Sequence, residues 1–263
     1  MGKFEGILLA TDWDGTFYQG KLFDENIKAL KYYVAEGGKF TVCSGRYSGF
    51  LASFKDIVPF NTYTICYNGA YIVDLDNNDI LYKGFCDEHL FDIVDDIIEA
   101  KLEYTTISIY NDKDNEPVTY TIDDFFQKKE EIKKEKIYKI LFRAETTDAG
   151  TRGAQAANKM ELYNYIAVRS WGLSLEILKR ENAKGAAIRR LAEHIGSKLV
   201  VAVGDYENDL DMIEAADIGY AVGNAIDEVK KIADRITVNV EDSAIAHIIY
   251  DLERDIDNKV IIL

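Results

Sequence analysis

The sequence predicts an α/β core built on a parallel sheet, with an α+β domain inserted into it. Apolar runs with the length of buried strands alternate with amphipathic helical stretches near both ends of the chain. The middle of the chain instead places strands next to one another, with helices between them. Because strand–helix alternation is typical of parallel sheets covered on both faces, we expect the core to be Rossmann-like.

The expected core strands are short apolar runs, most of them followed by a helical pattern. They lie at residues 7–10, 40–43, 63–67, 199–203 and 218–222. Asp24 is placed to cap the helix that follows the first run, and Gly37 and Gly38 end that helix. Further helices are expected at residues 209–216 and 227–233. The core pattern is therefore interrupted between its third and fourth strands.

The interruption has the size and the pattern of a separate domain. Its expected strands are at residues 104–110, 118–122 and 137–143, and its expected helices are near residues 87–101, 123–135 and 147–158. About a hundred residues are enough for a hydrophobic core of their own. We therefore assign residues 1–82 and 178–263 to the core and residues 83–177 to the inserted α+β domain.

Composition and charge exclude several classes of partner. Of the 263 residues, 48% are hydrophobic, and no apolar run has the length that a membrane span needs. The net charge of −15 repels nucleic acid and anionic lipid, so we expect neither as a partner. Cys43, Cys66 and Cys86 lack the spacing of a zinc site. The first residues show no signal-peptide pattern, so we expect a cytoplasmic protein.

The first motif that carries chemistry is Asp12-Trp13-Asp14-Gly15-Thr16, directly after the first apolar run. Ligands of open α/β sheets bind at the carboxyl ends of the strands, so the motif lies where a site is expected. Side chains two apart on an extended chain point the same way, which places the two carboxylates side by side. Such a pair requires a proton on one member or a cation between them. A plain acidic turn is the alternative.

Two further motifs offer groups that can bind phosphate. Ser44-Gly45-Arg46 follows the run at residues 40–43, where a hydroxyl and free backbone N–H groups can hold a phosphate oxygen. A plain helix-capping serine is the alternative. Lys184 begins a helical stretch, where the helix dipole disfavours a cation, so another group should require its charge. An exposed surface lysine is the alternative there.

The last motif is an acidic cluster, Gly204-Asp205-Tyr206-Glu207-Asn208-Asp209, directly after the run at residues 199–203. Asp205 is expected at the strand end, with Asn208 and Asp209 in the first helical turn. Because Mg²⁺ takes oxygen ligands, the cluster is a candidate magnesium site. A helix-capping acidic turn is the alternative.

Taken in this order, the four motifs resemble those of the haloacid dehalogenase (HAD) superfamily: DxDGT, a Ser or Thr after the second strand, a Lys, and GDxxxD. Asn68-Gly69-Ala70 and Ala221-Val222-Gly223-Asn224-Ala225 resemble its Cof-like, type IIB branch. That branch carries its cap domain between the second and third motifs, where the insertion lies. One departure is the segment before Lys184, where relatives usually have a Pro and a Gly.

The resemblance implies a Mg²⁺-dependent phosphatase that acts on a small phosphorylated metabolite. Asp12 would attack phosphorus and form an aspartyl-phosphate, while Asp14 would serve as the acid and the base. The metal ligands would be Asp12, Asp14 through its backbone carbonyl, Asp205 and, in support, Asp209. The phosphoryl oxygens would be bound by Ser44, Gly45, Lys184 and Asn208. The cap would close over the site and select the substrate.

Two alternatives stay open at this point. A phosphomutase would share every motif and would return the phosphoryl group to its substrate. A receiver-like signalling module also combines a phospho-accepting Asp with a second acid, a Ser or Thr and a Lys. Asp14 argues against such a module, because an acid–base group hydrolyses the intermediate that a signal must preserve. We also expect that loss of Lys184 lowers turnover and changes thermal stability little.

Overall fold

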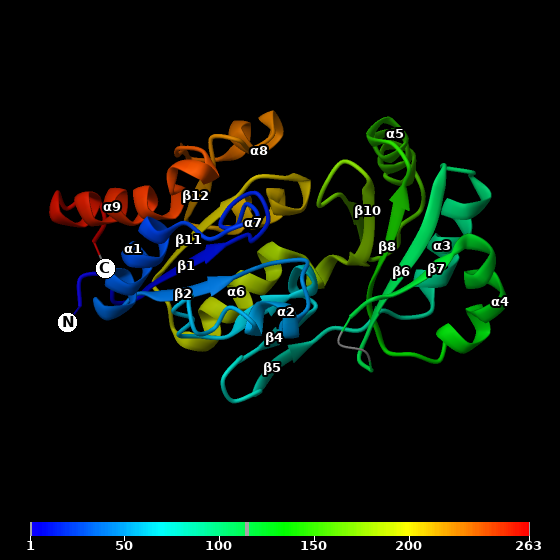
Figure 1. Cartoon of the computed structure of the whole chain (residues 1–263), viewed down its shortest axis with the longest axis horizontal. Helices are drawn as coiled ribbons and strands as arrows, with labels where there is room; N and C mark the ends of the chain where they lie inside the picture. Colours follow the sequence, from blue (N-terminus) through cyan, green and yellow to red (C-terminus); the bar gives the residue numbers. More distant parts are fainter. Residues whose placement is uncertain (1, 114–115, 263) are drawn as a thin grey trace. The chain divides into compact units, whose positions relative to one another are not determined.

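The computed structural model describes residues 2–113 and 116–262, which divide into two compact units (Figure 1). The first unit combines the residues up to Leu81 with those from Lys184 onward. The second unit is the stretch Tyr82–Ala183. The chain therefore leaves the first unit once, after Leu81, and returns to it at Lys184.

The first unit is built on a five-stranded sheet in the order β13-β12-β11-β1-β2, in which every pair of neighbours is parallel. This arrangement confirms the α/β fold class predicted from the alternating pattern. Every residue of β1 is buried, because the central strand of such a sheet is covered on both faces. The strands are β1 (Ile7–Thr11), β2 (Lys39–Val42), β11 (Leu199–Gly204), β12 (Ile218–Ala221) and β13 (Arg235–Ile236).

The first unit also contains two pairs of helices that pack against each other. α1 (Asp24–Ala35) packs against α9 (Ala244–Asp257), and α6 (Lys184–Ile195) packs against α7 (Leu210–Ala215) (Figure 1). The shorter elements of the unit are α2 (Ser48–Ala52), α8 (Asp227–Ile232) and the 3-10 turns η1 (Tyr67–Gly69), η3 (Glu207–Asp209) and η4 (Val240–Asp242). A small sheet consists of β3 (Thr64–Cys66), β4 (Tyr71–Val73) and β5 (Ile80–Lys83).

Two local predictions are wrong in the first unit. Asp24 is not the N-cap of α1: Phe23 holds that position, and Asp24 is the first helical residue, where its charge still suits the helix dipole. The strand predicted at residues 63–67 belongs to the small sheet rather than to the five-stranded one. That strand ends at Cys66, because Tyr67 turns the backbone into the left-handed region with φ 52°.

The parallel register brings the candidate motifs to one edge of the sheet. Thr11, the last residue of β1, lies opposite Val42 of β2 and Val203 of β11. Because parallel strands point the same way, the residues that follow these strands emerge at the same carboxyl edge. This edge is therefore where Asp12 and the residues after β2 and β11 can meet.

The second unit is an antiparallel sheet in the order β7-β6-β8-β10-β9, with three helices. Its strands are β6 (Tyr104–Asn111), β7 (Val118–Thr121), β8 (Ile137–Ala144), β9 (Tyr165–Val168) and β10 (Ser174–Lys179). Its helices are α3 (His89–Glu99), α4 (Ile122–Ile132), α5 (Thr147–Ala157) and the 3-10 turn η2 (Arg180–Asn182). The prediction of an α+β composition for this stretch is confirmed.

The second unit has a hydrophobic core of its own. Alternate residues of β8, such as Ile140 and Phe142, pack with residues of α3 such as Ile93 and Ile97. All buried members of this cluster belong to the second unit. Over the described residues of the whole chain, no helix combines the length and the apolar character that a membrane span needs.

A contiguous core predicts that residues 82–183, produced alone, unfold in a single cooperative transition. Phe142→Ala should reduce the free energy of unfolding of this fragment by about 3–5 kcal/mol, because it removes a fully buried ring. Phe126, which is 47% exposed, provides a matched control: Phe126→Ala should change the free energy of unfolding by less than about 0.5 kcal/mol. Urea denaturation followed by circular dichroism measures both; a gradual loss of signal in the unmutated fragment would contradict the prediction.

Candidate active site

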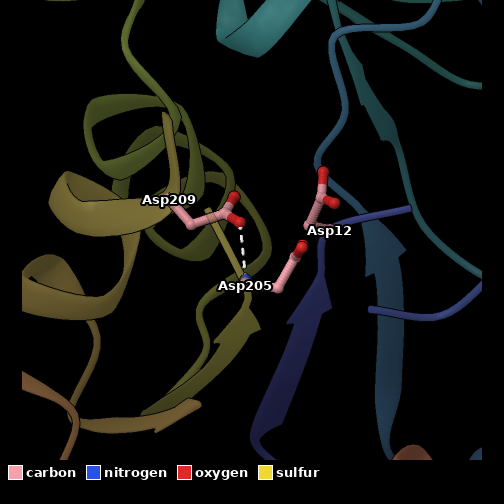
Figure 2. Close-up of side chains that lie close together, drawn as sticks. All are labelled: Asp12, Asp205 and Asp209. Carbon is pink, nitrogen blue, oxygen red and sulfur yellow. Dashed lines mark hydrogen bonds between the residues drawn. The ribbon is translucent and has the colours of Figure 1, made fainter. Parts of the chain in front are cut away.

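Three carboxylates from two segments of the chain converge at the carboxyl edge of the sheet. Asp12 directly follows β1, and its backbone N–H donates to the carbonyl of Val203 on β11 at 3.0 Å. One oxygen atom from each of Asp12, Asp205 and Asp209 lies within 4.8 Å of the others. Figure 2 shows the three side chains close together, with Asp12 directly after β1 and Asp205 and Asp209 in the segment after β11. The structure thus brings together the first and last motifs.

Lys184 lies inside this group. Its ammonium nitrogen donates to Oδ1 of Asp12 and to Oδ1 of Asp209, at 2.6 Å in both cases. The residue is only 1% exposed, so the alternative of an exposed surface lysine is wrong. The first residue of α6 therefore joins the carboxylates that follow β1 and β11.

Burial changes the proton affinities of this group. It raises the pKa of Asp12 well above its usual value, although the Lys184 charge acts against this. Burial, together with the charge of Asp209, raises the pKa of Asp205 to about 7. Burial alone would lower the pKa of Lys184, but the Asp12 and Asp209 carboxylates raise it well above its usual value. Three acids lie beside a single ammonium group, which contacts two of them, so the site can accept a further cation.

The donor set fits a magnesium ion. Carboxylate oxygens are ligands that Mg²⁺ prefers, and the oxygens of Asp12 and Asp205 lie close enough to share one ion. Asp209 is more heavily committed: its Oδ2 accepts the backbone N–H groups of Asp205 at 2.9 Å and Tyr206 at 3.1 Å. Asp209 thereby fixes the loop that carries Asp205.

The turn after Asp12 packs directly against Asp205. The hydroxyl of Thr16 donates to Oδ1 of Asp205 at 2.8 Å. Gly15 has φ +83°, and a Cβ atom there would lie 2.5 Å from Oδ2 of Asp205. Nδ2 of Asn224 donates to the Gly15 carbonyl at 2.8 Å and so holds the turn from outside. Only glycine at position 15 permits both this turn and the approach of Asp205.

The carboxylate of Asp14 has a different partner from the one expected. Nε and Nη2 of Arg46 donate to its two oxygens at 2.8 and 2.9 Å. Asp14 is not a member of the group formed by Asp12, Asp205 and Asp209. The expectation that Asp14 shares a proton or a cation with Asp12 through its side chain is therefore wrong in this structure. The cation that pairs with it is a guanidinium group, whose planar fork matches a carboxylate.

Ser44 and Gly45 follow β2 at the same edge. The backbone N–H of Ser44 donates to the carbonyl of Ile65 at 2.9 Å, and the Ser44 hydroxyl oxygen accepts the backbone N–H of Arg46 at 3.2 Å. Ser44 does not cap a helix, because the N-cap of α2 is Tyr47. The serine is 1% exposed and Gly45 is half-buried. The alternative of a plain capping serine is therefore wrong.

Asn68 connects the second and fourth motifs. Its backbone N–H donates to the Ser44 carbonyl at 2.8 Å, and its Oδ1 accepts from Nδ2 of Asn208 at 3.4 Å. Asn68 has φ 60°, a left-handed conformation that asparagine tolerates better than most residues. It is buried, and its contacts hold the loops after β2 and β11 at a fixed separation.

A model of haloacid dehalogenase-like hydrolases matches residues 9–249. The chain belongs to this family. The family predicted from the four motifs is thereby confirmed, and the match spans both units.

Individual relatives of this hydrolase cover nearly its whole length. The protein YxeH of Bacillus subtilis is 29% identical over 266 residues, which are 93% of this chain and 97% of that protein. The 5-amino-6-(5-phospho-D-ribitylamino)uracil phosphatase YwtE of the same organism is 28% identical over 286 residues, with 93% and 97% coverage. The solved structure of the HAD subclass IIB sugar phosphatase BT4131 superposes with a TM-score of 0.75 at 20% identity, covering 93% of this chain and 98% of that one. The fold of the hydrolase is thus that of a subclass IIB member.

The structure also shows residues that sequence reasoning did not assign a role. Arg46 and Asn68 lay inside quoted motifs, but their partners are distant in sequence, and no spacing rule indicates them. Thr16 is the last residue of the first motif, and Asn224 lies in a segment quoted for the resemblance. Those motifs were the only signals that could have marked these four residues.

From the sequence, loss of Lys184 was expected to change thermal stability little. Because Lys184 is buried, we now expect its loss to destabilise the protein. Lys184→Met leaves Asp12 and Asp209 buried without the ammonium group that contacts both, so the free energy of unfolding should fall by about 3–5 kcal/mol near pH 8 in EDTA. The loss should shrink as the pH falls, because burial raises the pKa of Asp12 and protonation of that carboxyl removes uncompensated charge. Lys28→Met, at an exposed lysine of α1, is the control and should change little. Equal stability of the two variants would show that Lys184 has no structural role.

Proposed function

We propose that this hydrolase is a Mg²⁺-dependent phosphatase that moves the phosphoryl group of a small phosphate ester first to Asp12 and then to water. The observation that carries the proposal is the buried Asp12 carboxylate at the end of β1, held by Lys184 beside Asp205. YwtE is named a phosphatase of a phosphorylated metabolite, which supports the same class of substrate here. A small phosphorylated metabolite is therefore the proposed partner.

The proposed metal ligands are the side chains of Asp12 and Asp205 and the backbone carbonyl of Asp14. Asp209 supports the site from behind, since its oxygens already accept from Lys184 and from two backbone N–H groups. When bound, Mg²⁺ supplies positive charge that offsets the repulsion between the phosphate dianion and the carboxylates. The residues themselves supply the nucleophile, the proton and the remaining positive charge.

In the first step, an oxygen of Asp12 forms a bond to phosphorus while the bond from phosphorus to the leaving alcohol breaks. Asp14 gives its proton to the leaving oxygen. Because Asp14 accepts two N–H groups of Arg46 in this structure, it must exchange that contact to reach the leaving group. Lys184, Ser44, the N–H of Gly45 and Asn208 bind the transferring oxygens.

In the second step, Asp14 takes a proton from water, and the water oxygen attacks the phosphorus of the aspartyl-phosphate. The Asp12–phosphorus bond breaks, which releases inorganic phosphate and restores the carboxylate. A mutase would instead return the phosphoryl group to an alcohol. Within this proposal, the second unit excludes water and selects the alcohol, and the cytoplasmic location expected from the sequence stays a prediction.

Asp12→Asn should abolish turnover, since an amide does not form the acyl phosphate. The decrease should be at least about 10⁴-fold, the scale seen when a covalent nucleophile is removed. A panel of phosphorylated metabolites, assayed for phosphate release, measures the effect. Asp24→Asn on α1 is the matched control and should keep full activity.

For a sugar 1-phosphate substrate, a phosphatase releases inorganic phosphate and a mutase yields the 6-phosphate. Accumulation of the 6-phosphate would contradict the proposed hydrolysis. Activity of a folded Asp12→Asn protein near that of the unmutated enzyme would contradict the choice of nucleophile.

Removal of the metal should remove activity, and Mg²⁺ should restore it. We also expect the affinity for Mg²⁺ to weaken from about pH 8 to about pH 6, because protonation of Asp205, with its pKa near 7, competes with the cation. Calorimetric titration of the chelated protein measures this affinity without reference to activity. Asp205→Asn should weaken binding at both pH values, and full activity after exhaustive chelation would contradict the role of the metal.

A further inference from the structure

Lys184 has an unusual place in the chain, because it is the first residue after the chain returns from the second unit. It is also the first residue of α6. The first N–H groups of a helix have no partner inside the helix, and a capping side chain usually supplies one. Ala183 precedes Lys184 and has no side-chain oxygen with which to do so. The residue before α6 therefore offers no side-chain cap to its first N–H groups.

Asp211 provides a partner for one of these N–H groups. Its Oδ2 accepts the backbone N–H of Gly185, the second residue of α6, at 2.7 Å. Asp211 lies in the first turn of α7, the helix that packs against α6. A carboxylate at a helix N-terminus also interacts favourably with the helix dipole. Asp211 thus performs across two helices the task that an N-cap residue performs within one.

A second contact joins the same two residues. A Cβ atom on Gly185 would lie 2.3 Å from the backbone oxygen of Asp211, so the first turns of α6 and α7 approach as closely as glycine permits. The side chain of Asp211 and its backbone therefore both fix Gly185. Because Lys184 is the neighbouring residue, its Cα position is fixed with it.

We propose that Asp211 is a positioning residue for the reaction, which seats the first turn of α6 so that the Lys184 ammonium reaches the phosphoryl site. This inference rests on the proposed function, in which Lys184 binds the transferring oxygens. Two acids of one segment then hold the same lysine: Asp209 contacts its ammonium group, and Asp211 holds its backbone. Both anchors belong to the first unit.

Paired substitutions test the role of the acceptor. Asp211→Ala should reduce kcat by about 10- to 100-fold, because small displacements of a charge-stabilising group have effects of this size. KM should change by less than about threefold, since the other phosphate-binding groups stay in place. Asp211→Asn keeps a side-chain oxygen for the N–H of Gly185 and should restore kcat to within about threefold of the unmutated enzyme.

Asp217 provides a matched control. Its Oδ2 accepts the backbone N–H of Val200 at 2.7 Å, the same distance as in the contact between Asp211 and Gly185. Val200 lies near the start of β11, away from the carboxyl end that carries the candidate site. Asp217→Ala should lower the melting temperature and leave kcat unchanged. Gly185→Ala gives an independent variant if Asp211→Ala does not fold: it keeps the acceptor, forces the two helices apart and should also lower kcat.

Four outcomes would overturn the inference: normal kcat in Asp211→Ala, no rescue by Asp211→Asn, normal kcat in Gly185→Ala, or an equal loss of kcat in Asp217→Ala. Lys184→Met separates this failure from failure of the proposed function. If Lys184→Met is inactive while Asp211→Ala is fully active, only the positioning role is lost. If folded Lys184→Met is fully active, the assigned role of Lys184 in catalysis is itself wrong.

Discussion

A single buried ammonium group holds the candidate active site together. Nζ of Lys184 lies 2.6 Å from carboxylate oxygens of both Asp12 and Asp209, and all three side chains are almost entirely buried. Buried charges are tolerated only when they are paired, so each member of this group requires the others. The loops after β1 and β11 and the start of α6 are consequently tied to one point. A cation at Asp12 and Asp205 would add charge to the same point.

Close approaches of the backbone make this convergence possible. Gly15 leaves room for the Asp205 carboxylate, and Gly185 lets α6 contact α7. Asn68 accepts a left-handed conformation and thereby reaches both Ser44 and Asn208. At these positions the absence of a steric clash matters more than any attractive contact, because a larger or branched residue would push the loops apart. Residues without a direct chemical role, such as the two glycines, are therefore needed to bring the acids and the lysine together.

The second unit also buries charged side chains, and it pairs them with each other. Lys139 of β8 and Glu176 of β10 form an ion pair on positions that alternate with the hydrophobic core residues, and both are 1% exposed. The hydroxyl of Ser170 also donates to Glu176, and the Lys139 nitrogen lies 4.4 Å from the centroid of the Tyr110 ring. A buried pair of this kind contributes little net stability unless its remaining hydrogen-bonding groups are satisfied. The unit provides such partners from its own strands and loops.

The sequence by itself determined the α/β pattern, the inserted α+β stretch and the four motifs, because hydrophobic periodicity and strand-end position are local properties. It misplaced Asp24 and the strand at residues 63–67, where single residues and backbone turns decide the boundaries. Only the tertiary structure decided that Lys184 is buried, that Arg46 pairs with Asp14 and that Asp211 seats α6. Lys184 and Asp12 are 172 positions apart, and no local pattern encodes such a contact. These pairings arise because the parallel register and the packing of α6 on α7 bring distant charges into one low-dielectric space.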